Sequence, residues 1–367
     1  MGTGRLAQSG AARRAVAIGS LVFVLALLSS CSVGVGGNEG KTGVSLIIKT
    51  QTNPYFVSMK EAAQDAAKKS GAHLSVASGN ADGDTQNQIN AINTAVARGD
   101  KGILITSNGP AVNAALRQAK EFGLFVIALD TPLDPVNTAD VTYATNNFEA
   151  GKLIGTYAAE RLKGQKAVIA MLDLYDDQVV SVDIGRDHGF LTGMGIDPGS
   201  DTLNAKEEKS GTYKGGKGGE YEIACHQATQ GAVDGGRKAM EQCLSRNPDI
   251  NVVYTINEPA GEGAYAALKA DNHEDKAFIV SIDGSCQGMD DVENGIFAAD
   301  ATQYPGKMAQ LGVDAVAKIG EGGEAPSLPP GEDFLDTGTK LVTAKPLPGV
   351  QSQSVEEGRK TCWGSTG

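Results

Sequence analysis

Amide and carboxylate side chains follow several apolar segments that have the composition of buried strands. Five residues stand at such strand ends: Asn53, Asp130, Asn257, Asp283 and Gln303. Side chains of these types form paired hydrogen bonds with neighbouring hydroxyl groups. Each one alone could instead be a turn residue or a helix cap, and for Asn53 or Asn257 we weigh the two interpretations equally. All five together predict one binding site for a ligand that carries many hydroxyls.

An aromatic pair, Tyr55 and Phe56, lies within residues 46–58, LIIKTQTNPYFVS. The branched apolar run at the start predicts a buried parallel strand, and the alanine-rich, charged sequence from Val57 predicts an exposed helix. This order places both rings at the carboxyl end of a strand, where open α/β sheets bind their ligands. The simpler alternative is that the rings are core residues under the helix, and this is our first interpretation of Phe56 alone.

The remaining chain alternates strands and helices in two successive sets. Strands are predicted at 72–78, 101–106, 125–130 and 140–143, then at 166–172, 222–225, 252–256, 277–283, 298–303 and 339–343. Helices are predicted at 82–97, 111–121, 148–162, 182–194, 232–246, 260–270 and 307–318. This alternation predicts parallel, doubly wound sheets with right-handed crossovers.

Two segments fall outside this alternation. Residues 211–219 are rich in glycine and lysine, and we predict an exposed loop there because no strand leads into them and no helix follows directly. The stretch after Pro346 has little apolar content apart from Val350 and Trp363. It is predicted to be a surface tail that is pinned near Cys362 and Trp363.

Length and charge limit the possible functions. A chain of 367 residues fits about two domains. Its formal net charge of -12 argues against a nucleic-acid partner, because phosphate binding depends on a basic surface. The sequence also lacks the glycine-rich, lysine-containing phosphate loop of ATP-binding proteins, so any work driven by ATP must be done by partner subunits.

The amino terminus has the pattern of a secretion signal. Arginines precede an apolar segment, 15–28, that is too short to span a membrane as a helix. The segment leads into Leu-Ser-Ser-Cys, which resembles a bacterial lipobox and implies cleavage before Cys31 and lipidation of that residue. A plain signal peptide with an incidental cysteine is the alternative. We therefore predict a lipoprotein signal peptide at 1–30 and a lipidated, glycine-rich, flexible tether at 31–40.

Four further cysteines fit an exported protein in an oxidising compartment: Cys225, Cys243, Cys286 and Cys362. Three pairings are possible, and the sequence does not choose among them. We favour Cys225 with Cys243 for their proximity, and Cys286 with Cys362 because a tail needs fastening. A metal site is not expected, because neither Cys-x-x-Cys nor clustered histidines occur. His226 is accordingly predicted to be exposed to solvent.

From about Lys41 to Thr343 the sequence resembles the periplasmic sugar-binding proteins of ABC importers. The resemblance is to the ribose, fructose, galactose and inositol types, in the cluster that also includes the sensor domains of LacI-like repressors. The most specific motifs are TNPYFVSMKEAAQDAA, FVIALD, GRDHGFLTGM, VVYTINEPAGEGAYAAL, and VSIDGSCQG followed by ATQYPGKMAQLG. The ending CWG and the extended tail resemble the fructose-type binding lipoproteins of Gram-positive bacteria.

The resemblance implies a role for each residue of the proposed site. Tyr55 and Phe56 stack on the apolar faces of a sugar ring, and Asn53 orients the first loop. The sugar hydroxyls are bonded by Asp130, Asn257, Asp283 and Gln303. Gln230 is a further candidate, with Gln227, in the loop after a strand of the second set, where relatives contribute a ligand contact. A loop amide satisfied by its own surroundings is an equal alternative for both glutamines.

Three positions depart from the family pattern and leave the identity of the sugar open. Many aldose-binding members carry Asp-Arg where this chain has Asp130-Thr131, so a cationic fork for two hydroxyls is absent. Arg186 stands near the place of an arginine in the family's second domain, and a structural role on its helix is the alternative. Lys49 ends the first strand where relatives often have a small polar residue. It either replaces the lost cation or points to solvent.

The fold implied by the resemblance is the α/β, type I periplasmic-binding-protein fold. It has two doubly wound parallel-sheet lobes joined by three crossovers. The N-terminal lobe is expected to comprise residues 41–144 and 304–336. The C-terminal lobe is expected to comprise residues 145–303 and 337–367, including the surface tail.

The implied function is capture of a small solute outside the cytoplasm. We expect a monomeric lipoprotein, without cofactor, on the outer face of the cell membrane, which closes around a monosaccharide or polyol and delivers it to an ABC-type sugar permease. One alternative is a ligand-sensing partner of a membrane receptor. Another is a secreted carbohydrate-active enzyme that uses paired carboxylates such as Asp130 and Asp283. A repressor is not expected, because a secretion signal occupies the place of a DNA-binding domain.

Overall fold

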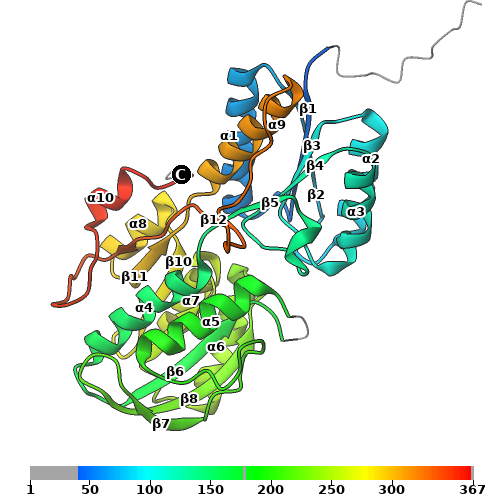
Figure 1. Cartoon of the computed structure of the whole chain (residues 1–367). Helices are drawn as coiled ribbons and strands as arrows, with labels where there is room; N and C mark the ends of the chain where they lie inside the picture. The colour runs from blue at the N-terminus through cyan, green and yellow to red at the C-terminus, as the bar shows by residue number, and fades with distance from the viewer. Residues whose placement is uncertain (1–39, 177–178, 365–367) are drawn as a thin grey trace, which may run out of the picture. The chain divides into compact units, whose positions relative to one another are not determined.

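The computed structural model describes residues 40–176 and 179–364 of the chain (Figure 1). The predicted signal peptide, the lipidation site Cys31 and the tether up to residue 39 lie outside this part of the chain. Within it, no helix is both long and apolar enough to cross a membrane.

The first sheet contains six parallel strands in the order β12-β5-β4-β3-β1-β2. Its strands are β1 (Gly43–Ile48), β2 (His73–Ser78), β3 (Gly102–Ile105), β4 (Phe125–Leu129), β5 (Val141–Ala144) and β12 (Leu335–Asp336). Its helices are α1 (Pro54–Ser70), α2 (Thr85–Arg98), α3 (Asn113–Glu121) and α9 (Pro305–Gly320), with 3-10 turns at Pro110–Val112 and Val136–Thr138. The sheet is doubly wound, because alternate side chains of β1 pack against different helices. Leu46 and Ile48 lie with residues of α1 and α9, whereas Ile47 lies with residues of α2 and α3.

The second sheet contains seven strands in the order β13-β11-β10-β9-β6-β8-β7. Its strands are β6 (Ala167–Asp173), β7 (Ser210–Tyr213), β8 (Gly219–Ala228), β9 (Val252–Thr255), β10 (Phe278–Asp283), β11 (Phe297–Thr302) and β13 (Leu341–Val342). Its helices are α4 (Asn147–Leu162), α5 (Ser181–Met194), α6 (Val233–Arg246), α7 (Glu258–Ala270), α8 (Cys286–Glu293) and α10 (Val355–Arg359). Only the pairs β7–β8 and β11–β13 are antiparallel within the described residues.

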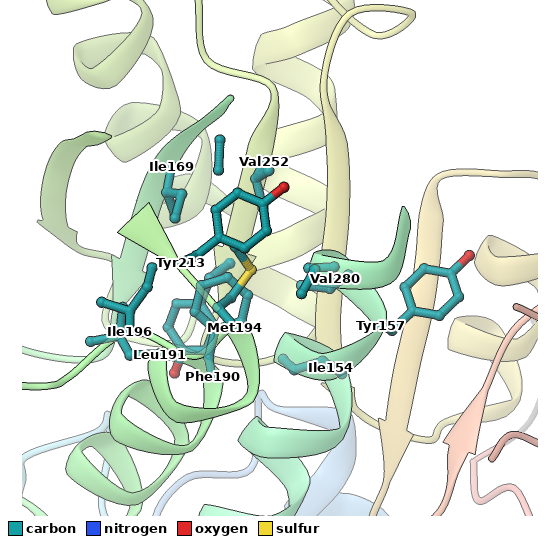
Figure 2. Close-up of a cluster of buried hydrophobic side chains, with 14 of the residues drawn as sticks. Ile154, Tyr157, Ile169, Phe190, Leu191, Met194, Ile196, Tyr213, Val252 and Val280 are labelled. Atoms are coloured by element: carbon teal, nitrogen blue, oxygen red, sulfur yellow. The ribbon is translucent and has the colours of Figure 1, made fainter. Parts of the chain in front are cut away.

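Helices α4 and α5 cover one face of the second sheet. Phe190, Leu191 and Met194 of α5 pack over Ile169 and Val252 of the strands (Figure 2). The opposite face carries residues of α6, α7 and α8. Burial on both faces explains why these strands are nearly continuous apolar runs in the sequence.

The segment 211–219 differs from the predicted exposed loop. Residues Ser210–Tyr213 form the edge strand β7, which pairs with β8, and β8 is much longer than the predicted strand at 222–225. The Tyr213 ring is buried in the core, and its hydroxyl donates a hydrogen bond to the carbonyl of Gln165 at 2.8 Å. Glycine and lysine dominate the composition of this segment. The composition therefore predicts a loop, although the buried Tyr213 side chain holds the β7–β8 hairpin against the core.

The chain passes between the two sheets three times, as the implied fold requires. The passages lie between β5 and α4, between β11 and α9, and between β12 and β13. Two disulfide bonds, Cys225–Cys243 and Cys286–Cys362, are present and have the pairing favoured from the sequence.

The end of the tail differs from its assignment to the C-terminal lobe alone. Trp363 is 9% exposed and belongs to a core cluster of the first sheet. Its ring meets the ring of Tyr55 edge-on at 5.3 Å, while its Nε1 donates to the carbonyl of Asp283 at 3.1 Å. Trp363 therefore contacts both lobes, and the adjacent Cys286–Cys362 disulfide fixes the chain next to these contacts.

Candidate functional site

Nine of the predicted site residues line one cavity at the carboxyl ends of the two sheets. They are Lys49, Asn53, Tyr55, Phe56, Asp130, Arg186, Asn257, Asp283 and Gln303. Asp130 directly follows β4 of the first sheet, and Asp283 ends β10 of the second. The cavity therefore presents carboxylates from both lobes to the same space, as expected for strand ends in open α/β sheets.

On the first-sheet side, Tyr55 positions the carboxylate of Asp130. The Tyr55 hydroxyl donates to Asp130 Oδ1 at 2.9 Å, and the Thr131 hydroxyl donates to Oδ2 at 2.9 Å. Asp130 adopts a left-handed backbone conformation with φ of 65°, which aspartate tolerates better than most residues. The rings of Tyr55 and Phe56 meet edge-on at 5.3 Å, so both are packed core residues that also line the cavity.

Lys49 points into the protein and not to solvent. It is 7% exposed, and its Nζ lies 5.9 Å from the centre of the Phe56 ring. It lines the cavity together with Asp82. Lys49 thus places its side chain on the first-sheet side of the cavity.

On the second-sheet side, Arg186 and Asp283 form the polar wall. Arg186 Nε donates to Asn147 Oδ1 at 2.8 Å, and its Nη1 donates to the carbonyl of Ile256 at 2.7 Å. The same Nη1 lies 3.9 Å from Asp283 Oδ1. Gln303 Nε2 donates to Asp283 Oδ1 at 2.8 Å. Arg186 therefore links α5 to the start of α4 and to the segment before α7, which is a structural role, and it also lines the cavity.

The two asparagines of the site are helix caps. Asn53 Oδ1 accepts from the backbone N–H of Tyr55 at 2.9 Å, at the start of α1. Asn257 Oδ1 accepts from the backbone N–H of Ala260 at 3.1 Å, and its amide donates to the carbonyl of Gly231 at 3.0 Å. These bonds use the carbonyl oxygen of each side chain for capping, which is the alternative weighed from the sequence.

Thr131 and Gln230 are not among the residues that line this cavity. Thr131 donates a hydrogen bond to Asp130 and lines a separate, larger groove. The Gln230 side chain is exposed, and its backbone has a positive φ of 56°. Gln227 lies elsewhere, at a third cavity, with its amide bonded to the carbonyl of His226.

Two residues that sequence reasoning did not identify contribute to the site. Asp82 lines the cavity from the turn before α2. Glu258, buried at the start of α7, accepts from the backbone N–H groups of Gly284 and Ser285, each at 3.0 Å. Both follow the predicted strand ends closely, and attention to every acid within a few residues of such an end would have found them.

Burial raises the pKa values of Asp283 and of two neighbouring acids. It raises the pKa of Asp283 to about 7, although Arg186 and the amide of Gln303 oppose the rise. Burial and the charge of Asp283 raise the pKa of Glu258 to about 8. Burial, together with Glu258 and Asp283, raises the pKa of Asp300 in β11 well above its usual range. Asp283 is thus partly protonated near neutral pH, and it can donate as well as accept hydrogen bonds.

The prediction that His226 is exposed to solvent is wrong. Only 18% of its side chain is accessible, and both ring nitrogens face carboxylates. Nδ1 lies 2.7 Å from Asp173 Oδ2, and Nε2 lies 2.8 Å from Glu207 Oε1. Burial lowers the pKa of His226, but these two hydrogen bonds outweigh it and raise the pKa to about 10. The acids come from distant positions in the sequence, so spacing alone gave no sign of the cluster.

Comparisons with known proteins agree with this architecture. A family model described as a periplasmic binding protein domain matches residues 44–324. The ribose import binding protein of Salmonella typhimurium is 27% identical over 312 residues, covering 83% of this chain and 93% of that protein. The D-apiose import binding protein of Actinobacillus succinogenes is 27% identical over 292 residues, covering 79% and 85%.

Solved structures show the same fold. A galactofuranose binding protein superposes with a TM-score of 0.70 at 22% identity, covering 87% of this chain and 98% of that one. An ABC transporter solute binding protein from Agrobacterium vitis with bound D-fucose also gives 0.70 at 22% identity, covering 87% and 99%. The two-lobed fold implied by the sequence resemblance is confirmed by these likenesses.

Proposed function

Because this chain belongs to the periplasmic binding protein family, we propose that it captures a monosaccharide or polyol between its two lobes and delivers it to an ABC-type permease. The observation that carries this proposal is the composition of one cavity. Carboxylates from both sheets, the amide of Gln303, two cations and two aromatic rings line it together. Hydroxyl-rich rings need hydrogen-bonding groups at their edges and apolar surfaces at their faces, and this cavity offers both.

The neutral charge of a sugar suits the balance of this cavity. Two basic residues, Lys49 and Arg186, line the cavity together with three acids, Asp82, Asp130 and Asp283. Burial raises the pKa of Asp283 to about 7. An anionic ligand would meet these carboxylates, and a cationic ligand would meet the two basic groups. Relatives named for ribose and D-apiose support a small sugar of this kind. We propose that Lys49 replaces the arginine that the family often places after Asp130.

Ligand binding would favour a closed form of the two lobes. Asp130 belongs to the first lobe and Asp283 to the second, so a sugar that bonds both is held better when they approach each other. A ligand shifts such an equilibrium only through its different affinities for the two forms. Gln303, at a passage between the sheets, donates to Asp283 and couples the connecting segment to the site.

A thermal-shift screen against ketoses, aldoses, polyols and inositols tests the proposal. A ligand at one hundred times its dissociation constant stabilises the folded protein by about 2.7 kcal/mol, which gives a clear rise in Tm. Asp283→Ala is expected to abolish the rise without changing the circular dichroism spectrum. Asp65→Ala, on the exposed face of α1, is the matched control and should respond like wild type. Stabilisation by amino acids or peptides, and by no sugar, would contradict the sugar assignment.

We propose binding without turnover, since the relatives reported above are binding proteins. The raised pKa of Asp283 is one property that a carbohydrate-active enzyme would also need. Incubation with the sugar found in the screen separates the two functions, because a binding protein returns it unchanged. Co-purification of permease subunits with the ligand-loaded protein supports import, whereas capture of a receptor alone supports a sensing role.

A further inference from the structure

A second polar cluster lies in the C-terminal lobe, formed by residues from three elements. Asp173 ends β6, Asp187 lies on α5, and His226 lies in β8. Strands β6 and β8 are parallel neighbours in which His226 pairs with Met171, two residues before Asp173. Side chains two positions apart share one face of a sheet, and α5 packs on the face that holds Met171. The fold thus brings the three side chains together under α5.

The donor atoms of this cluster have the separations of a metal site. One atom from each of the three side chains lies within 4.8 Å of the others. His226 Nδ1 is 2.7 Å from Asp173 Oδ2 and 4.0 Å from Asp187 Oδ2. Around a tetrahedral zinc ion, donors at about 2.0–2.2 Å from the metal lie roughly 3.4 Å from one another. The two separations from His226 Nδ1, 2.7 and 4.0 Å, lie on either side of this value.

The surroundings of Asp187 are a second observation that favours a cation at this cluster. Asp187 is 0% exposed, and no N–H or hydroxyl group of the described residues donates to either carboxylate oxygen; its one side-chain hydrogen bond is with the neighbouring carboxyl of Asp173. The nearest basic groups, His226 and His188, stand about 4 Å away. The adjacent Arg186 is directed to Asn147 and Ile256. Two buried carboxyl groups side by side repel each other when both are charged, and a bound cation in place of the proton that they share would offset this cost.

Glu207 completes the pattern expected around a metal-bound histidine. Its Oε1 lies 2.8 Å from His226 Nε2, on the side of the ring away from Asp187. Histidine ligands commonly donate their second N–H to a carboxylate, which fixes the ring and directs the other nitrogen to the metal. Here that nitrogen is Nδ1, and a metal ion would displace the proton that it shares with Asp173. Asp173 and His226 also line a cavity of about 310 Å³, which gives an ion an entry route and room for a water ligand.

From these observations we propose that Asp173, Asp187 and His226 bind one zinc ion, with Glu207 as the carboxylate that orients His226. One imidazole nitrogen and two carboxylates match zinc, which accepts N and O ligands, better than calcium or magnesium, which prefer oxygen alone. The ion takes the place between Nδ1 and the two carboxylates. Since α5 carries both Asp187 and Arg186, the site would also fix the position of Arg186 in the sugar cavity.

Calorimetric titration with Zn²⁺ tests the proposal on tag-free, full-length mature protein treated with EDTA and then freed of it. We expect one equivalent of zinc to bind and to raise Tm. Asp187→Asn preserves the shape of the side chain and should lose this binding. Asp291→Asn changes another buried acid, outside the cluster, and should retain it. Glu207→Gln keeps all three ligands and should weaken binding about tenfold, through loss of the orienting carboxylate.

Three results would overturn the zinc site. They are the absence of stoichiometric binding to wild type, equal binding to wild type and to Asp187→Asn, and tighter binding of Ca²⁺ or Mg²⁺ than of Zn²⁺. If Asp187→Asn does not fold, His226→Gln takes its place, and circular dichroism checks each variant. Sugar affinity is measured separately on the same samples. Failure of the zinc site can therefore be distinguished from failure of the sugar proposal.

Discussion

At the scale of single residues, burial and hydrogen bonding act in opposite directions on the pKa of Asp283. Asp283 accepts hydrogen bonds from Gln303 and from the backbone of Glu258, and it lies 3.9 Å from Arg186. Its burial nevertheless raises its pKa to about 7, and that of Glu258 to about 8. A carboxyl whose pKa is higher in the folded than in the unfolded protein holds more protons when folded. The free energy of unfolding therefore falls as pH rises through this range.

We predict that the ligand-free protein has a higher Tm near pH 5 than near pH 8. The window runs from the ordinary values of 3.8 and 4.5 to the raised values of about 7 and 8. A fall of about 3–8 °C is expected across it. Differential scanning calorimetry at several pH values measures the effect. Asp283→Asn should flatten the curve and Asp65→Asn should not, whereas a Tm that rises from pH 5 to pH 8 would contradict the assignment.

Helices α4 and α5 approach each other closely because glycines lie at their contact. A Cβ placed on Gly189 would stand 2.1 Å from the carbonyl oxygen of Phe148, whereas one on Gly185 would come no nearer than 3.2 Å, to Asn147 Cβ. Both glycines lie on α5, so the gain in helix propensity from alanine is the same for each. α5 also carries Arg186 and Asp187, and its contact with α4 therefore positions both polar sites.

We predict that Gly189→Ala destabilises the protein by about 2 kcal/mol or more, because the methyl group forces the helices apart. Gly185→Ala should change stability by less than about 1 kcal/mol, since the extra contact offsets the gain in propensity. Chemical denaturation of both variants measures the difference. Equal effects of the two substitutions would show that the close contact with α4 is not the reason for glycine at position 189.

The tail connects the two lobes at the level of the whole molecule. Trp363 contacts the Tyr55 ring of one lobe and donates to the Asp283 carbonyl of the other. Tyr55 in turn donates to Asp130, so the indole contacts a side chain that lines the proposed sugar cavity. The Cys286–Cys362 disulfide fixes the tail next to this contact.

We predict that Trp363→Ala lowers the free energy of unfolding by about 3 kcal/mol through loss of a buried ring. It should also weaken sugar binding about tenfold, because Tyr55 loses the ring that supports it. Trp363→Phe keeps a ring without the indole N–H and should recover most of both losses. Unfolding curves and sugar titrations measure the two effects. Unchanged affinity in Trp363→Ala would limit the residue to a structural role.

The predicted membrane attachment also concerns the whole molecule. We predict that Cys31→Ser moves the protein from the membrane fraction to the soluble fraction, because the cysteine would no longer carry a lipid. Ser32→Ala alters the neighbouring residue and should leave the distribution unchanged. Immunoblots of fractionated cells make the measurement. Recovery of the wild-type protein in the soluble fraction would favour the plain signal peptide.

Local pattern determined the elements that are long and strongly apolar. The strand before Lys49 and the polar ends at Asp130 and Asp283 were predicted, because burial on both faces leaves a continuous apolar run. The helix predicted from Val57 is also present, but it begins earlier, at Pro54, so that Tyr55 and Phe56 lie in its first turn. The hairpin at β7, the short helix α8 and the two-residue strand β12 were not, since each depends on contacts with distant residues. Propensity over a few residues carries little information about such contacts.

The sequence by itself therefore determined the alternation of strands and helices, and with it the residue types that gather at the strand ends. Only the tertiary structure decided what each side chain does there. It made Asn53 and Asn257 helix caps, left Gln230 exposed, and turned Lys49 inward over Phe56. It also placed His226 between Asp173 and Glu207, which are 53 and 19 residues away. Hydrogen-bond partners and burial are set by chain segments that meet only in the fold, and spacing along one segment contains no record of them.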